Sequence, residues 1–157
     1  MIIRHAEKPD DPGEKDPNLS KRGFERAEAL AKVIPEHFPH PDFLIATKRS
    51  KGSNRPAETI TPLSKALHEE IEANEKDDDF AKVAHDVLTN PKYAGKVVLI
   101  AWHHGKIPEL AKALGAKDAP DKWKGEVFDR VWEITSADGS ATFKDLPQNA
   151  LPGDSDK

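Results

Sequence analysis

Short apolar runs alternate along the chain with longer segments in which apolar residues recur every three or four positions. Ile2 and Ile3 end a first short run, and two more lie at 43–46 and 96–102. Runs of this length, bounded by polar residues, predict buried strands. Apolar residues have helical spacing in the segments 21–34, 55–67, 78–88 and 107–115. The pattern therefore predicts strands and helices in alternation.

Several residues mark the ends of these helices. Ser20 is placed to cap the helix that follows it, and Pro56 lies in the first turn of the next helix, where proline is tolerated. Gly115 is expected to stop the last helix, because glycine readily adopts the left-handed conformation of a helix end. Pro62 lies inside a helical segment and predicts a kink.

The remaining segments are loops and weaker strands. The stretch 7–19 is rich in Pro, Gly and Asp, and 47–54 is polar, so both are predicted loops. Residues 68–73 suit one more strand. The last two strands are expected at 126–135 and 140–146, joined by a turn at Asp138-Gly139.

This order predicts an α/β fold: a three-layer sandwich with a mostly parallel central sheet flanked by helices. The C-terminal hairpin is expected to form an antiparallel edge. We expect one domain over residues 1–146 and a loose tail over residues 147–157. The length of 157 residues suits one domain with one sizeable core.

Composition narrows the function classes. The chain contains no cysteine, which excludes disulfides, thiolate catalysis and cysteine-bound zinc. Its net charge of −4 argues against general binding of nucleic acid. No apolar run approaches the roughly 20 residues of a membrane span, and no signal peptide is evident. A cytoplasmic location is expected, with a signal peptide removed before Met1 left open.

Three predicted loops bring basic and imidazole side chains to one edge of the sheet. The loops follow strands, and ligands of α/β sheets bind beyond the carboxyl ends of strands. The first loop begins with Arg4 and His5, and the third contains His103 and His104. The second loop carries the candidate substrate-binding residues Lys48, Arg49 and Ser53, together with Lys51, Asn54 and Arg55.

This set of side chains suits phosphoryl chemistry. Arginine forks match the oxygens of a phosphoryl group, and positioning with electrostatic stabilisation accounts for most of the catalysis of its transfer. A histidine can also accept the phosphoryl group covalently, which divides one hard step into two. That route requires no metal and no cofactor.

The motifs RHAEKP, SNRPAET and VLIAWHHGKIPEL together resemble those of the histidine phosphatase superfamily, the phosphoglycerate mutase-like fold. The resemblance implies that His5 is the nucleophile and that Arg4 and Arg55 clamp the phosphoryl oxygens. It implies His104, directly before Gly105, as the second histidine of the pocket. Neighbouring residues of a strand point to opposite faces, so we expect His103 to point away. Ala6 replaces the usual glycine of the signature.

The general acid is left open at this point. The family pattern places it either directly after the second histidine, where this chain has glycine, or between the second and third motifs. The acidic segment 68–80 lies in that interval and offers Glu72, Asp77 and Asp78 as candidates among its carboxylates. Glu7, close to His5 along the chain, is also near enough to consider.

The leading hypothesis is a metal-independent phosphatase that hydrolyses phosphomonoesters, or a phosphorylated protein residue, through a phosphohistidine on His5. Its partner would be a small phosphorylated substrate or a phosphoprotein, with no nucleic acid and no membrane; the oligomeric state is left open. The alternatives are a non-catalytic module that binds phosphorylated ligands and a phosphoglycerate-type mutase. A metallohydrolase using His5, His103 and His104 lacks the support of a metal-binding HExxH motif.

Overall fold

The computed structural model describes residues 1–10 and 16–155, and their strands form one six-stranded sheet in the order β3-β2-β4-β1-β5-β6. The first four of these are parallel, whereas β5 runs antiparallel to β1 and β6 antiparallel to β5. The bounds of the strands are β1 Ile2–Arg4, β2 Phe43–Ala46, β3 Ile71–Glu72, β4 Val98–Trp102, β5 Arg130–Ala137 and β6 Ser140–Pro147. The predicted α/β class and the antiparallel hairpin edge are confirmed.

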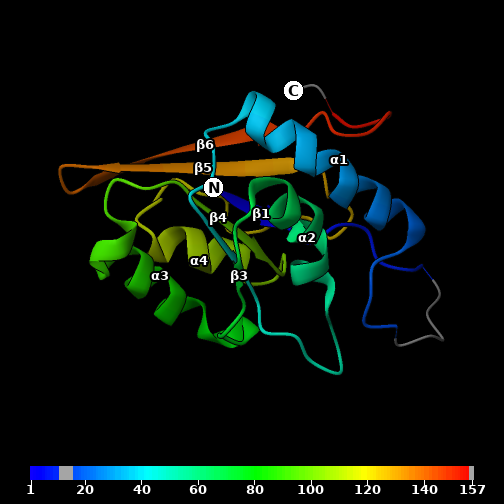
Figure 1. The fold of residues 1–157 in the computed structure, drawn as a ribbon. Coiled ribbons are helices and arrows are strands. Elements are labelled where there is room, and N and C mark those ends of the chain that lie inside the picture. The colour runs from blue at the N-terminus through cyan, green and yellow to red at the C-terminus, as the bar shows by residue number, and fades with distance from the viewer. Residues whose placement is uncertain (11–15, 156–157) are drawn as a thin grey trace.

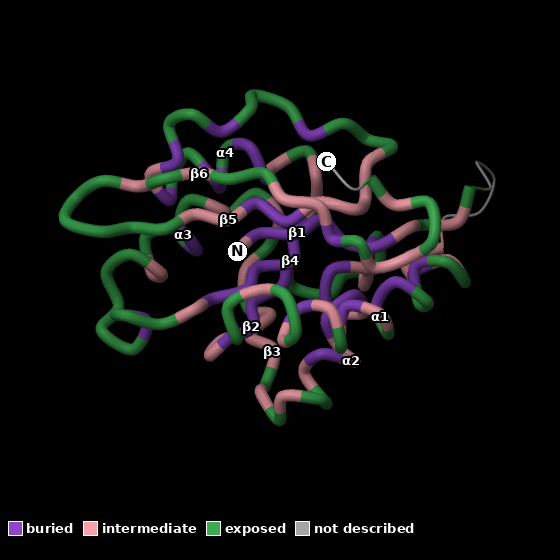
Figure 2. Tube along the Cα trace, turned by 90° about the horizontal axis from the view of Figure 1, so that it is seen from above, coloured by how far each residue is buried: buried purple, intermediate pink, exposed green. Residues whose placement is uncertain are grey.

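Helices cover both faces of the sheet, so the fold has three layers (Figures 1 and 2). Their bounds are α1 Lys21–His37, α2 Arg55–Leu67, α3 Phe80–Thr89 and α4 Ile107–Ala113, with short 3-10 turns at Asp77–Asp79 and Pro91–Tyr93. The helix ends agree with the sequence prediction. The hydroxyl of Ser20 accepts a hydrogen bond from the N–H of Gly23 at the start of α1. Gly115, beyond the end of α4, has a φ of +100°. Helix α2 continues through Pro62.

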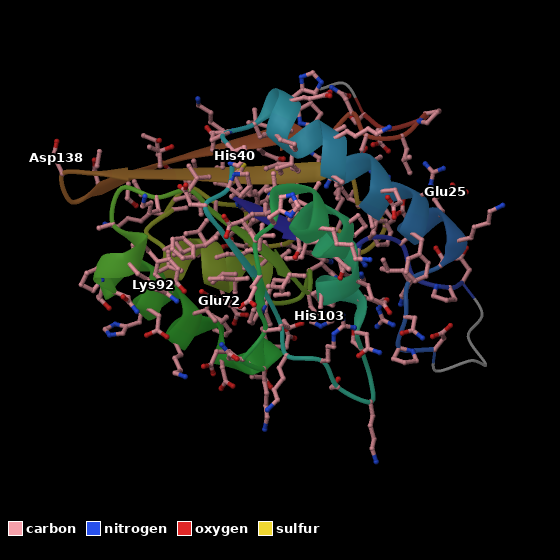
Figure 3. The ribbon with its side chains drawn as sticks, viewed as in Figure 1. Glu25, His40, Glu72, Lys92, His103 and Asp138 are labelled. Atoms are coloured by element: carbon pink, nitrogen blue, oxygen red, sulfur yellow. The ribbon has the colours of Figure 1, made fainter. Side chains whose placement is uncertain are left out.

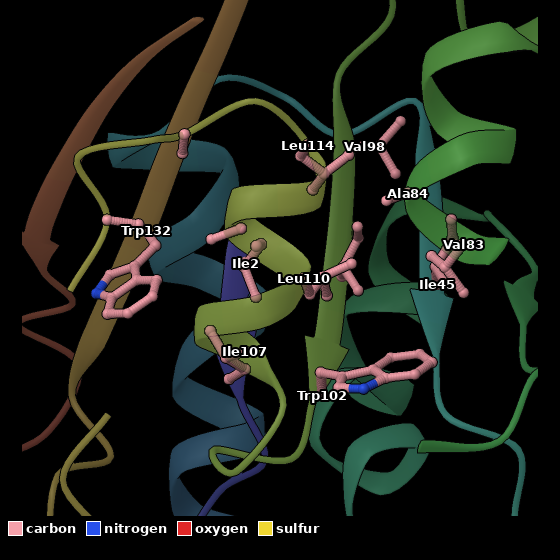
Figure 4. Close-up of a cluster of buried hydrophobic side chains, with 14 of the residues drawn as sticks. Ile2, Ile45, Val83, Ala84, Val98, Trp102, Ile107, Leu110, Leu114 and Trp132 are labelled. Carbon is pink, nitrogen blue, oxygen red and sulfur yellow. The ribbon is translucent and has the colours of Figure 1, made fainter. Parts of the chain in front are cut away.

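Side chains alternate between the two cores along the central strands. Ile3, Leu99 and Ala101 pack with residues of α1 and α2. Ile100 and Trp102 point the other way and pack with residues of α3 and α4, and Figure 4 shows Trp102 among them. Strands buried on both faces are typical of parallel sheets. Because this alternation continues past the strand ends, it also determines to which face of the sheet the residue after each strand points.

The segment after β6 differs from the prediction of a loose tail. Gln148 is only 1% exposed, and its backbone N–H donates to the carbonyl of Asp129 over 2.8 Å. Its side-chain oxygen accepts a hydrogen bond from Nη1 of Arg26. The carboxylate of Asp154 accepts hydrogen bonds from both terminal nitrogens of the same guanidinium. Residues 147–155 are therefore anchored on α1 by a buried arginine. Residues 156–157 lie outside the described residues, as do residues 11–15 of the predicted first loop.

The backbone after His5 packs closely on the start of α1. The carbonyl of Glu7 accepts from both the N–H and the hydroxyl of Ser20. A Cβ atom at Gly23 would lie 2.2 Å from that carbonyl oxygen. Only glycine allows this approach, so Gly23 holds α1 against the loop that follows His5.

We predict that Gly23→Ala lowers the free energy of unfolding by about 1–3 kcal/mol, the usual cost of overpacking. Urea denaturation measures this change. Gly105→Ala is the matched control, because a Cβ atom there meets nothing within 4 Å. Equal stability of the two variants would show that α1 can shift away from the loop at little cost.

Candidate active site

His5 directly follows β1 and is 3% exposed. Its backbone N–H donates to the carbonyl of Trp102, which continues the β1–β4 ladder by one residue. The ring Nδ1 lies 2.7 Å from the carbonyl oxygen of Ala6. Because a carbonyl only accepts, Nδ1 must carry the proton, and Nε2 keeps its lone pair. This is the form of imidazole that can act as a nucleophile.

The surroundings of His5 keep its ring neutral. Burial lowers the pKa of His5 to about 3, and the nearby Arg4, His103 and Arg55 act in the same direction, while the hydrogen bond to Ala6 opposes them. A neutral imidazole beside buried cations is available for attack at neutral pH.

His103, and not His104, is the histidine that lies against His5. Their rings are 5.2 Å apart between centroids and meet edge to face. Burial is the largest cause that lowers the pKa of His103 to about 4, and the charges of Arg55, His104 and Arg4 lower it further. Figure 3 shows His103 at the carboxyl edge of the sheet, above the loop between β2 and α2.

The sequence analysis expected His104, and not His103, against His5, and the strand register explains the difference. Arg4 is paired with Trp102 in the parallel ladder, so the next residue of each strand, His5 and His103, continues on the same face. His104 lies close to Arg4: its Nε2 is 3.6 Å from the position of a Cβ atom at Gly125, and the carbonyl of Gly125 accepts from Arg4. Burial lowers the pKa of His104, and the charges of Arg4 and Lys8 add to this shift.

Arg4 is almost fully buried beside this pair of histidines. Its Nη1 donates to the carbonyls of Gly125, at 2.5 Å, and Val127, at 3.1 Å. Its guanidinium carbon lies 3.8 Å from the centroid of the Phe128 ring. Burial lowers the pKa of Arg4 to about 10, so it stays charged at neutral pH. Residues 126–128, expected as the start of a strand, instead lie with Gly125 in the loop that holds this arginine.

Arg55 approaches the site from the first residue of α2. Its Nη1 donates to the carbonyl of Asp16 over 2.9 Å. Burial lowers the pKa of Arg55, against the opposing charges of Asp16 and Glu58. The same turn of α2 is tied to the first loop, because the N–H of Ala6 donates to the hydroxyl of Thr59. The start of α2 therefore lies against the first loop, close to His5.

The two arginines share an unusual feature. Within the described residues, Nε of Arg4 and Nε of Arg55 are buried and have no hydrogen-bond partner. A buried donor left unpaired costs about 1–3 kcal/mol. The two charges are also close enough for Arg55 to lower the pKa of Arg4. An oxyanion between them would satisfy both donors and both charges.

The other predicted site residues have mixed positions. Lys48 and Arg49 are exposed on the loop after β2. Ser53 is buried, and its hydroxyl accepts the N–H of Arg55 over 3.3 Å. Ser53 therefore supports the backbone of Arg55 through its hydroxyl oxygen.

The acid candidates differ clearly. Glu72 binds Lys92 and the hydroxyl of Tyr93, and Figure 3 shows Glu72 and Lys92 apart from His103. Asp78 is exposed and pairs with Lys106. The carboxylate of Glu7 is held by Arg26 and Arg22.

Asp77 remains as the candidate with a perturbed carboxyl group. Its Oδ1 is buried without a partner among the described residues. Its backbone carbonyl accepts from Nε1 of Trp102, the residue before His103. Burial raises the pKa of Asp77 to about 6, and Asp78 adds to the rise while Lys106 opposes it. Such a group can hold a proton near neutral pH.

Sequence reasoning missed two supports of the site. The carbonyls of Gly125 and Val127 bind Arg4 through backbone atoms, which leave no sequence signal. Arg26 and Asp154 hold Glu7 from α1 and from the C-terminal segment. In residues 1–10 and 16–155, no group of three or more His, Asp or Glu side chains is placed to hold a metal ion. No helix in the same residues is long and apolar enough to cross a membrane.

Solved structures of known proteins share this arrangement of strands and helices. The protein histidine phosphatase SixA, in a complex with tungstate, has a TM-score of 0.67 over 94% of this chain and 95% of its own, at 16% identity. A mycobacterial glucosyl-3-phosphoglycerate phosphatase, in a complex with inorganic phosphate, has a TM-score of 0.64 over 92% of this chain and 93% of its own, also at 16% identity. This is the histidine phosphatase fold.

A third solved structure with a similar fold is a mutase. A phosphoglycerate mutase from Bacillus anthracis has a TM-score of 0.57, with 92% of this chain and 90% of its own covered, at 16% identity. No protein-family model matches the sequence, and no curated protein is similar to it in sequence. The resemblance seen in the motifs is confirmed at the level of the fold.

We predict that the imidazoles of His5 and His103 stay neutral in the folded protein down to pH values of about 3 and 4. Inorganic phosphate should raise both pKa values, because a bound anion favours the charged imidazole. Nitrogen-15 NMR of the histidine rings measures both effects, with chloride at equal ionic strength as the control. A His5 ring that titrates near its ordinary pKa of 6.5 without phosphate would contradict this account of the site.

Proposed function

We propose that this protein is a metal-independent phosphatase that acts through a phosphohistidine on His5. The observation that carries the proposal is the pair of unpartnered buried Nε atoms of Arg4 and Arg55 beside a neutral imidazole. Two guanidinium groups with free donors suit the oxygens of a phosphoryl group. The substrate would be a phosphomonoester or a phosphorylated protein residue.

In the first step, Nε2 of His5 attacks phosphorus and the bond from phosphorus to the leaving oxygen breaks. The bonding pair goes to the leaving oxygen, which takes a proton from the general acid. His5 keeps the proton on Nδ1, and the carbonyl of Ala6 stabilises the positive charge that develops on the ring. Arg4 and Arg55 stabilise the negative charge on the transferring oxygens, which is usually the largest contribution to such catalysis.

In the second step, water attacks phosphorus and the bond from phosphorus to Nε2 breaks. The electron pair returns to Nε2, and the water proton passes to the carboxylate that acted as the acid. Inorganic phosphate leaves, and His5 is restored in its neutral form.

We assign His103 as the second histidine of this site in place of His104. Its ring contacts His5 edge to face, and its Nε2 lies 3.5 Å from the hydroxyl of Thr47. From this position His103 can donate a hydrogen bond to a phosphoryl oxygen held by the two arginines. His104 lies at the rim beside Gly125 and would have a smaller role.

We assign Asp77 as the general acid. Among Glu72, Asp77 and Asp78, it alone combines a partly buried carboxyl group with a pKa raised to about 6. Glu72 is held in its own pairs, and Asp78 is exposed. A catalytic acid works best with a pKa near the working pH.

The neighbours of the fold support an activity on phosphoryl groups. Two of them are described as phosphatases, one with tungstate and one with inorganic phosphate bound. Both ligands are tetrahedral oxyanions of the type that Arg4 and Arg55 are arranged to receive.

We predict that the protein hydrolyses p-nitrophenyl phosphate and forms a phosphoenzyme on His5. His103→Ala should lower kcat by about 10²–10³-fold, the scale of one preorganised donor, whereas His104→Ala should lower it much less. Rapid quench at high pH, which preserves phosphohistidine, followed by peptide mass spectrometry locates the label. Label on serine or on another histidine would refute the assignment of His5.

We predict that kcat/KM for an alkyl phosphate falls as pH rises through about 6, because Asp77 must be protonated to donate. The acid side of the profile should rise between about pH 3 and 4, as His5 and then His103 lose their protons. Asp77→Asn should remove the fall above pH 6 and slow alkyl phosphates more than p-nitrophenyl phosphate, whose leaving group needs no proton. Asp78→Asn is the control, and an unchanged fall in Asp77→Asn would assign the acid elsewhere.

A further inference from the structure

The loop between β2 and α2 carries a row of exposed cations at the carboxyl edge of the sheet. Lys48, Arg49 and Lys51 are all exposed there. Within residues 1–10 and 16–155, none of the three has an ion-pair partner. In Figure 1 this loop extends beyond the ends of the strands, on the same edge as the residues that follow β1 and β4.

Hydrogen bonds hold the loop in one shape. The N–H of Lys48 donates to the carbonyl of Glu75 over 2.7 Å, and the N–H of Ser50 donates to the carbonyl of Ser53. The hydroxyl of Ser50 accepts from the N–H groups of Gly52 and Ser53. Because the hydroxyl of Ser53 in turn accepts from Arg55, the turn is fixed relative to the proposed phosphoryl clamp.

Nearby carboxylates do not compensate these charges. Glu75 pairs with Lys82, Glu72 with Lys92 and Asp78 with Lys106. Three like charges on one ordered turn repel each other, and no structural contact of their side chains offsets this. The chain as a whole has a net charge of −4, so the positive edge is a local feature.

The row lies on the turn that leads directly into Arg55. Lys51 is four residues before Arg55, so their Cα atoms are at most about 14 Å apart. The turn closed by Ser50 and Ser53 shortens this separation. A second anionic group on a substrate could therefore contact the cations while its phosphoryl group is held by Arg55.

We propose that the substrate carries a second anionic group beside its phosphoryl group, and that Lys48, Arg49 and Lys51 bind it. This inference rests on the proposed phosphatase function and names the class of its substrate. The second group is a carboxylate or phosphate, supplied either by a small phosphate ester or by acidic residues that flank a phosphorylated residue of a protein.

A matched pair of small substrates tests the proposal. 3-Phosphoglycerate and glycerol 3-phosphate differ by a carboxylate against a hydroxymethyl group. We expect kcat/KM to favour the first by about tenfold, through several exposed charge pairs of modest strength each. The preference should weaken as sodium chloride is added, since salt screens exposed charges. A preference below twofold, or one that is independent of salt, would overturn the proposal for small substrates.

The combined variant Lys48→Ala, Arg49→Ala and Lys51→Ala should reduce this ratio to near one. The control removes the same charge from exposed lysines elsewhere, with Lys32→Ala on α1 and Lys65→Ala on α2, together with Lys117→Ala after α4. The control should keep the wild-type ratio. A ratio that stays unchanged in the loop variant would assign the second group to other residues.

A peptide pair distinguishes the source of the second group. Phosphohistidine peptides with Asp and Glu flanks are compared with the same peptides carrying Asn and Gln. A preference for acidic peptides without one for 3-phosphoglycerate assigns the loop to a protein substrate, and the reverse assigns it to a small ester. No preference in either pair refutes the proposal.

Absence of any hydrolysis would refute the proposed function. Binding measurements would then test whether Lys48, Arg49 and Lys51 bind a second anionic group. Isothermal titration of the wild-type protein and the loop variant with 3-phosphoglycerate and glycerol 3-phosphate then decides it. Tighter binding of 3-phosphoglycerate that is lost in the loop variant supports the anion subsite. Equal affinities for the two ligands reject it.

Discussion

The parallel pairing of β1 with β4 determines where the reactive side chains of this protein lie. Arg4 is paired with Trp102, and the N–H of His5 donates to the carbonyl of Trp102. Because side chains alternate along strands, this register places the rings of His5 and His103 against each other. A shift by one residue would exchange the faces and separate the two imidazoles. The contact between the two rings is therefore a consequence of the sheet.

Burial then gives these side chains their chemistry. Burial lowers the pKa of His5 to about 3 and that of Arg4 to about 10, so at neutral pH the site combines neutral imidazoles with charged guanidinium groups. The backbone carbonyls of Gly125 and Asp16 each accept from one arginine, but a buried Nε of each remains unpaired among the described residues. These unpaired donors and charges make the site locally positive, although the whole chain has a net charge of −4.

The sequence predicted the strands and helices well, because these depend on local pattern. Apolar runs and helical spacing indicated the strands and helices, and strand ends placed Arg4, His5 and Arg55 at one edge. The choice between His103 and His104 depended on the register between strands that lie far apart in the sequence, which no local pattern encodes. Alternation correctly separated the two histidines, but it could not show which one shared a face with His5. Residues 126–128 were expected as the start of a strand, yet in the structure the carbonyls of Gly125 and Val127 hold Arg4.

The anchoring of the C-terminal segment is another feature that local sequence pattern does not reveal, and it connects this segment to the candidate active site. Its Gly, Pro and Asp composition suggests a loose tail, but Asp154 is matched to a charge buried in α1. Arg26 is 2% exposed, so its guanidinium is stable there only with the carboxylates of Glu7 and Asp154 against it. Glu7 lies two residues after His5, and this pairing holds the loop that orients the imidazole through Ala6. The same pairing occupies Glu7, which explains why a carboxylate so close to His5 along the chain is a support of the site and is not free to serve as its acid.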